Sequence, residues 1–324
     1  MIIDEKLMNI TSLGLHITDK CNAKCVHCAF GCGPEIEGSM KLEEAKRYVA
    51  DAKELEFEIV CITGGEPMLY PNLVEKIISE CAHVSFPEIW LFTNCFWARD
   101  MHKACSIVEK LRHLGLTKIF TSIDFFHQSY VPIKSVKNAI EASLESGLEV
   151  CVDARFIGEP YEENEFNSAT RLHLEFLGNL LSKVELVKAQ PMCVGRAVEF
   201  LASHVKMEPL SEILNEKCLG AWAGGTLESP LGVDVDEFRF VTICPGLSIG
   251  NVREASLRKI VGEYDYKDHG VIAALYDEGM KGLMNLASEN GFVPKETYVS
   301  GCHFCYEARK FLRNIFPDAF TLLT

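Results

Sequence analysis

The feature that most constrains the fold is a regular alternation of short β-branched or apolar runs with longer amphipathic stretches between residues 14 and 200. This alternation is typical of parallel strands joined by right-handed helical crossovers. The expected strands cover residues 15–18, 58–63, 89–93, 118–123, 149–156 and 184–189. The expected helices cover residues 41–55, 71–82, 100–114, 132–146 and 167–181. An open doubly wound sheet and a complete or partial βα barrel both fit, and both place their chemistry at the carboxyl ends of the strands.

The last third of the chain follows a different pattern. A hairpin is expected from residues 233–236 and 238–243, and helices from about 271–290 and 304–315. We therefore expect two domains, a βα domain over residues 1–205 and a smaller one over residues 206–324.

Acidic residues outnumber basic ones, because 46 Asp and Glu against 32 Lys and Arg give a formal net charge of −14. This argues against a nucleic-acid partner, since phosphate contacts need a concentrated basic face. The 48% of hydrophobic residues is typical of a globular protein. The first six residues include two acids where a secretory signal would be basic, and no apolar run approaches the roughly 18 residues of a membrane span. We expect a cytoplasmic protein with no membrane partner.

Fourteen cysteines are many for a chain in a reducing compartment, where metal or redox chemistry explains them better than disulfides. Three of them, Cys21, Cys25 and Cys28, form a CxxxCxxC loop after the first expected strand. Three thiolates suit three corners of a 4Fe–4S cluster and leave the fourth iron open to a small molecule such as S-adenosylmethionine. The alternative is a zinc knuckle with His27 or Cys32 as the fourth ligand.

This triad resembles the signature of the radical S-adenosylmethionine (radical SAM) enzymes, in which an aromatic-type residue precedes the last cysteine. His27 holds that position, and the resemblance implies that it lies against the adenine. The resemblance covers residues 12–200. It implies an α/β fold built as a partial (β/α)6 TIM-type barrel, followed by a smaller C-terminal α+β domain.

Further segments resemble the S-adenosylmethionine site of the same family. The Gly-Gly-Glu-Pro run after the second expected strand looks like the segment that holds the methionine amino group, since glycines admit a close ligand and a carboxylate accepts from an ammonium. Arg155 stands where many members hold the methionine carboxylate. The cofactor-binding residues that the resemblance implies are His27, Gly64, Gly65, Glu66, Pro67, Asn94, Ser122, Asp124, Arg155 and Val194.

A second cysteine group lies in the last third of the chain: Cys218, Cys244, Cys302 and Cys305. It resembles the twitch module, which carries an auxiliary iron–sulfur cluster behind some radical SAM barrels. The resemblance implies one fully ligated auxiliary 4Fe–4S cluster that accepts or relays an electron. Four thiolates holding a structural zinc are the alternative.

The resemblance implies an enzyme that takes an electron from a donor such as a flavodoxin or ferredoxin. It cleaves S-adenosylmethionine to a 5′-deoxyadenosyl radical, which abstracts a hydrogen atom from the substrate. Residues 122–132 look like a loop of members that modify ribosomally made peptides, so a peptide is the expected substrate. Oxidation of a small-molecule alcohol and a non-catalytic metal-binding or electron-carrier protein are the alternatives. The triad lies so near the first residue that no peptide-binding domain is expected ahead of the barrel.

The sequence also bears on the outcome of the reaction. Epimerases of the family need a thiol to return hydrogen, and Pro245 stands where the resemblance leads us to expect that cysteine. Epimerisation would then depend on another thiol at the mouth of the barrel, for which Cys193 and Cys95 are the candidates.

Overall fold

The structure is a computed structural model that describes residues 10–218 and 220–321. The segment 1–6, whose acids argue against a secretory signal, lies outside the described residues. The centre of the molecule is a nine-stranded sheet in which β1 to β6 run parallel. From edge to edge its strands are β10 (Leu247–Asn251), β9 (Phe240–Cys244), β8 (Gly232–Asp236), β1 (Ser12–His16), β2 (Ile59–Thr63), β3 (Glu88–Phe92), β4 (Lys118–Ser122), β5 (Glu149–Arg155) and β6 (Glu185–Ala189).

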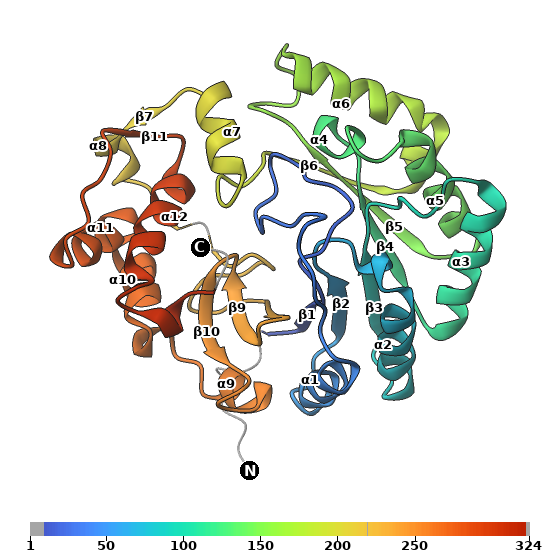
Figure 1. Ribbon diagram of the computed structural model, residues 1–324, viewed down its shortest axis with the longest axis horizontal. Helices are drawn as coiled ribbons and strands as arrows, with labels where there is room; N and C mark the ends of the chain where they lie inside the picture. The colour runs from blue at the N-terminus through green and yellow to red at the C-terminus, as the bar shows by residue number, and fades with distance from the viewer. Residues whose placement is uncertain (1–9, 219, 322–324) are drawn as a thin grey trace.

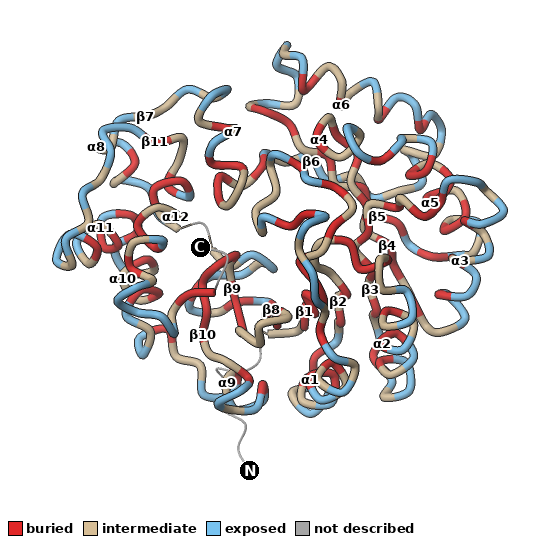
Figure 2. Tube along the Cα trace, in the orientation of Figure 1, coloured by how far each residue is buried: buried red, intermediate tan, exposed pale blue. Residues whose placement is uncertain are grey.

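The long helices between the parallel strands lie on the outside of the curved sheet (Figure 1). They are α1 (Leu42–Glu54), α2 (Pro71–His83), α3 (Met101–Leu114), α5 (Ile133–Glu145) and α6 (Glu165–Phe176). The short helix α4 (Phe125–Gln128) follows the carboxyl end of β4, and the 3-10 turns are η2 (Pro67–Leu69) and η3 (Gly178–Lys183). Each long helix has an apolar stripe: in α1 the buried residues recur at helical spacing, as Ala45, Tyr48, Val49 and Ala52. Buried residues accordingly follow the strands and the inner sides of the helices (Figure 2).

The sheet is open, because β6 and β10 form its two edges and do not pair with each other. The chain therefore forms a partial barrel, as expected. All six predicted parallel strands and the helices between them are present, and most of their ends lie within three residues of the predicted positions. The exception is the predicted helix 167–181, which is α6 followed by the turn η3.

The C-terminal part extends the same sheet. The predicted hairpin is the antiparallel pair β8 and β9, and β8 lies parallel to β1. The other elements are α7 (Ala197–His204), β7 (Glu208–Pro209), α8 (Leu210–Ile213), α9 (Leu257–Gly262), η4 (Tyr266–Asp268), α10 (Gly270–Glu278), α11 (Met280–Glu289), β11 (Thr297–Tyr298), α12 (Gly301–Leu312) and η5 (Pro317–Ala319).

One predicted helix is wrong in its extent. The stretch 271–290 forms two helices, α10 and α11, which are separated by Gly279 at a φ of +68°. A side chain there would meet the Glu216 carbonyl oxygen at 2.5 Å, so only glycine fits this turn. None of the described helices is both long and apolar enough to cross a membrane.

The buried central strand yields a first prediction. Leu15 on β1 is completely buried, whereas Leu172 on α6 is 64% exposed. Leu15→Ala should lower the free energy of unfolding by about 2–5 kcal/mol, because it leaves a cavity beneath the site. Leu172→Ala should change it by less than about 0.5 kcal/mol. Urea titrations measure both, and equal losses would contradict this view of the core.

Candidate active site

A cavity of about 500 Å³ lies on the inner face of the sheet. Its wall is built from alternate strand residues, because successive side chains of a strand point to opposite faces. Strand residues that line it include His16 of β1, Cys61 and Thr63 of β2, Trp90 and Phe92 of β3, Phe120 and Ser122 of β4, Cys151, Asp153 and Arg155 of β5, and Asp234 of β8. The loops after β1, β2 and β3 complete one side of it. The predicted site residues that line the cavity are Cys21, Cys25, His27, Cys28, Gly64, Gly65, Asn94, Ser122 and Arg155.

The cysteine triad is brought together by the loop after β1. The loop returns on itself, since the Cys21 N–H donates to the Gly33 carbonyl at 3.1 Å and the Cys28 N–H to the Cys25 carbonyl at 3.2 Å. The segment after β6 supports it from the other side, because the Arg196 N–H donates to the Cys28 carbonyl at 3.1 Å. The three thiols are thus held on one wall of the cavity.

Burial makes two of these thiols hard to ionise without a ligand. It raises the pKa of Cys21 to about 12 and raises the pKa of Cys25 still further above its ordinary value. A metal that binds here would have to displace these protons. The pKa of Cys28 is lowered to about 6, chiefly by a hydrogen bond with Cys32.

The spacing of the sulfurs tests whether a single zinc ion fits. A tetrahedral zinc with Zn–S bonds of about 2.3 Å holds its sulfurs roughly 3.8 Å apart. Among the described residues, the triad is not one of the groups that bring three ligand atoms within 4.8 Å of one another. The three thiols, as they stand here, are not gathered around one tetrahedral ion, and three soft ligands on one short loop suit three corners of a cluster.

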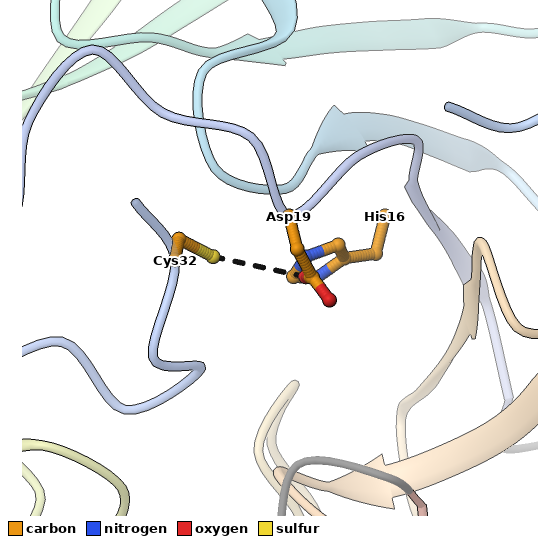
Figure 3. Close-up of side chains that lie close together, drawn as sticks. All are labelled: His16, Asp19 and Cys32. Carbon is orange, nitrogen blue, oxygen red and sulfur yellow. Dashed lines mark hydrogen bonds and ion pairs between the residues drawn. The ribbon is translucent and has the colours of Figure 1, made fainter. Parts of the chain in front are cut away.

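Cys32, the candidate fourth ligand, lies beside the triad, where it hydrogen-bonds with Cys28 and lines the same cavity. Its thiol points toward Asp19 Oδ1 at 3.7 Å, and the same oxygen is 2.6 Å from His16 Nε2 (Figure 3). Burial would lower the pKa of His16, but the bond and the charge of Asp19 raise it to about 8. This buried network holds Cys32 beside the triad.

Glu66, one of the implied cofactor-binding residues, lies in a buried hydrogen-bond network at the ends of β2 and β3. It is fully buried and does not line the cavity. Its carboxylate accepts hydrogen bonds from the Met68 N–H at 2.9 Å, the Thr93 hydroxyl at 2.9 Å and the Asn94 N–H at 2.7 Å. Burial nevertheless raises its pKa to about 7. Glu66 thereby joins the end of β2 to the end of β3, and the backbone of Gly64 and Gly65 faces the cavity.

His27, Asp124 and His127 form a compact group at the edge of the cavity. Burial lowers the pKa of His27 to about 3, so its ring is neutral, and it packs on Phe126 with ring centroids 4.5 Å apart. Burial would raise the pKa of Asp124, but the charge and hydrogen bond of His127 lower it to about 2. Asp124 is completely buried behind the histidines and does not line the cavity.

The remaining predicted cofactor residues are less directly placed. Arg155 lines the cavity, yet its Nε donates to Asp153 Oδ2 at 2.9 Å and its Nη1 to the Gln190 carbonyl at 3.1 Å. Pro67 and Val194 are buried away from the cavity.

The two thiols proposed for hydrogen return also lie outside the cavity. Cys95 is completely buried and bonds to Thr121 Oγ1 at 3.3 Å, and Cys193 packs in a separate apolar cluster. Two other cysteines, Cys61 and Cys151, do line the cavity. Their alternation with other inward-facing strand residues is the sequence signal that could have identified them.

The second cysteine group comes together between β9 and α12. Cys302 and Cys305 lie one turn apart near the N-terminus of α12, and Cys244 ends β9. Burial raises the pKa of Cys244 to about 12, although the charge of Arg309 opposes this, and the other three thiols add to the increase. Cys302 is exposed and the other three are partly buried, so the group is within reach of solvent. This group also is not among those with three ligand atoms within 4.8 Å of one another in the described chain.

Asp234 and Asp153 are acids of the cavity wall that sequence reasoning missed, and Asp234 comes from the C-terminal part of the chain. It lies in register with Gly14 of β1, where a side chain would stand 1.6 Å from Asp234 Oδ1. The glycine in the middle of β1 therefore makes room for this carboxylate. Burial raises the pKa of Asp234 to about 6, although the charge of His16 opposes this.

Asp234 gives a prediction of pH dependence. Because its pKa in the folded protein is above the ordinary value of 3.8, ionisation costs stability as the pH rises from about 4 through 6. Asp234→Asn removes this cost, so its stability relative to wild type should increase over that range by about 1–3 kcal/mol. Chemical denaturation at pH 4.5 and 7.5 measures the difference, and the exposed Asp268→Asn is the matched control. If the free energy of unfolding of Asp234→Asn and of wild type changed with pH in the same way, the pKa of this carboxylate would not be raised in the folded protein.

Comparison with known proteins places the site in context. The family model described as "Radical SAM superfamily" matches residues 15–172. Among curated relatives, the "Putative peptide biosynthesis protein YydG" of Bacillus subtilis (strain 168) is 26% identical over 133 residues, or 41% of each chain. A GTP 3′,8-cyclase of Clostridium botulinum (strain Hall) is 28% identical over 157 residues, which are 45% of this chain and 47% of the relative. The matched region thus spans less than half the length of either relative.

A solved structure resembles nearly the whole chain. The structure described as "Native anSMEcpe with bound AdoMet" matches with a TM-score of 0.56 at 15% identity, and the match covers 94% of this chain and 97% of that one. At this identity the similarity concerns the fold alone.

Proposed function

We propose that the chain, whose residues 15–172 match the radical SAM family model, cleaves S-adenosylmethionine reductively and abstracts a hydrogen atom from a substrate in the cavity. The observation that carries the proposal is the position of Cys21, Cys25 and Cys28 together on the cavity wall. When bound there, a 4Fe–4S cluster supplies the electron that splits the cofactor into methionine and a 5′-deoxyadenosyl radical. A flavodoxin or ferredoxin is the proposed donor of that electron.

The residues around the triad have the properties that the cofactor requires. Gly64 and Gly65 line the cavity, and the absence of a side chain lets them pack directly on the loop after β1, where a Cβ would meet the carbonyl oxygens of Thr18 and Lys20. His27 is neutral and offers a ring to the adenine, beside Asn94 and Ser122. We assign Arg155 to the methionine carboxylate, since the guanidinium has further donors besides those that bond Asp153 and Gln190.

Glu66 has a supporting part in this proposal. Its oxygens are already bonded to three protein donors, so it fixes the ends of β2 and β3. The segment from Gly64 to Pro67 then meets the cofactor through its glycine backbone. Asp124 acts in the same indirect way, because it orients His127 beside His27.

The apolar wall of the cavity is suited to shield the 5′-deoxyadenosyl radical from water. Trp90, Phe92 and Phe120 present aromatic carbon to the interior, with Phe92 and Phe120 stacked at 4.4 Å. An apolar wall excludes water and holds one substrate C–H bond near the reactive carbon. We propose that residues 1–205 form the domain that binds the cofactor and residues 206–324 the domain that carries the auxiliary cluster, and this division stays a prediction.

We propose a ribosomally made peptide as the substrate. The similarity to YydG, named for peptide biosynthesis, supports a peptide, whereas the GTP 3′,8-cyclases offer a nucleotide as the alternative. The wall carries both signs of charge, with His16 and Arg155 as cations and Asp153 and Asp234 as acids. The choice of a peptide therefore rests on the similarity to YydG.

The triad is tested by two cysteine variants. Cys25 and Cys81 are both buried, but Cys81 lies on α2 away from the cavity. Cys25→Ala should reduce reductant-dependent formation of 5′-deoxyadenosine to background, because the cluster loses one of its three ligands. Cys81→Ala should retain it. Chromatography of anaerobic reactions measures the nucleoside, and cleavage that persists in Cys25→Ala would remove the basis of the proposal.

The auxiliary group is tested separately. We propose one 4Fe–4S cluster on Cys218, Cys244, Cys302 and Cys305, which exchanges an electron with the substrate radical. Cys302→Ala should leave substrate-free cleavage of S-adenosylmethionine intact and lower the iron content from about eight to about four per chain. It should also stop modification of candidate peptides, as followed by mass spectrometry. A Cys302→Ala variant that still modifies the peptide would exclude a redox role for this group. If the wild-type protein oxidised an alcohol and modified no candidate peptide, the peptide substrate would be excluded.

A further inference from the structure

Arg309 is buried in a way that calls for a negative partner. It lies on α12, one helical turn after Cys305, and only 1% of it is exposed. Its Nη1 donates to the Pro245 carbonyl at 3.0 Å, while its Nε is buried without a partner. Among the described residues, no carboxylate lies within 4.0 Å of the guanidinium.

The groups that surround Arg309 are the cysteines of the auxiliary group. Its near neighbours are Cys244, Cys302 and Cys305, of which Cys305 also hydrogen-bonds with it. Glu216, an acid of this region, uses its carboxylate to accept from the Gly301 N–H at 2.9 Å. Lys310 follows Arg309 along α12 but is exposed. Arg309 thus faces sulfur and backbone, not a carboxylate.

A buried guanidinium is costly without a counter-ion, because it is charged at every pH at which the protein folds. Four neutral thiols do not balance it. Metal-bound cysteines are thiolates, and a 4Fe–4S cluster with four of them carries a net negative charge. The fold therefore contains one half of an ion pair whose other half is the loaded auxiliary site.

We propose that Arg309 is the built-in counter-ion of the auxiliary site and that it makes this site an electron acceptor. The inference rests on the proposed auxiliary cluster and specifies its direction of use. Reduction adds one negative charge to the cluster, and a cation held beside it at low dielectric stabilises the reduced state. Arg309 accordingly raises the reduction potential, while no covalent bond at the site changes.

The alternative is that Arg309 is only a structural residue that bonds the Pro245 carbonyl. The two views predict different effects of an Arg309 substitution on the stability of the metal-free and of the cluster-loaded protein. A structural residue stabilises the metal-free and the loaded protein by the same amount. A counter-ion stabilises only the loaded protein and destabilises the metal-free protein, in which its charge is unbalanced. Replacing it by an apolar side chain should then leave the stability of the metal-free protein unchanged or increase it.

The test compares Arg309→Met with Lys310→Met, which removes the same charge from the exposed neighbour on the same helix. Thermal unfolding is measured for metal-free and anaerobically reconstituted full-length protein. We expect Arg309→Met to leave Tm unchanged or raise it by about 2 °C in the metal-free protein, and to lower it when loaded. Lys310→Met should shift neither. Equal decreases in both states of Arg309→Met would establish the structural role and overturn the inference.

The second readout is the reduction potential of the auxiliary cluster, titrated in the Cys25→Ala background so that the first cluster does not contribute. Arg309→Met should make reduction at least tenfold less favourable, which is about 59 mV for a one-electron couple. Arg309→Lys, which keeps the charge, should recover most of that change. Unaltered potentials would refute the acceptor role.

The failure of this inference is distinguishable from failure of the proposed function. About four irons and one zinc per wild-type chain would refute the acceptor role and leave the radical SAM site intact. Absence of 5′-deoxyadenosine from the wild-type protein would refute the proposed function, and the unfolding comparison would still decide whether Arg309 is a counter-ion.

Discussion

The pairing of β1 with a parallel strand on each side is the constraint on which the rest of the structure depends. β2 lies on one side of it and β8 on the other, although β8 follows more than 200 residues later in the chain. This pairing buries β1 and fixes the loop that carries the cysteine triad over the inner face of the sheet. It also brings Asp234 of the C-terminal part into the same cavity. The two parts of the chain therefore share one site.

Each cysteine group has a buried guanidinium beside it. Arg196 contacts the triad through its N–H bond to the Cys28 carbonyl, and its Nη1 is buried without a partner. Arg309 lies beside the auxiliary group, and its Nε is buried without a partner. What distinguishes the two groups is their access to the cavity, because the three cysteines of the triad line it and the four auxiliary cysteines do not. A cofactor that binds a second molecule through an open iron needs such a cavity, whereas one that only exchanges electrons does not.

Much of the fold followed from local patterns. The six parallel strands and their helices were predictable because their apolar periodicities are strong and their connections short. The pairing of β8 with β1 was not, since it depends on contacts between distant segments. The break at Gly279 was missed because a single glycine within an apolar helical pattern has no distinct signal apart from the φ that its surroundings impose.

The candidate site was only partly predictable for a related reason. The triad and the glycines after β2 are compact motifs, and they line the cavity. Glu66 lies in the same motif, yet three hydrogen bonds with its neighbours turn it away from the cavity. Cys61 and Asp234 belong to no motif, and they contribute through strand alternation and register, which become visible only when the sheet is assembled.

The central claim is that three cysteines hold a cluster whose fourth iron binds S-adenosylmethionine. Electron paramagnetic resonance of the reduced, reconstituted protein tests it most directly, with spectra recorded before and after the cofactor is added. The account predicts that one cluster signal changes its g values and that the change is absent in Cys25→Ala. A wild-type spectrum that stays the same with saturating cofactor would contradict it.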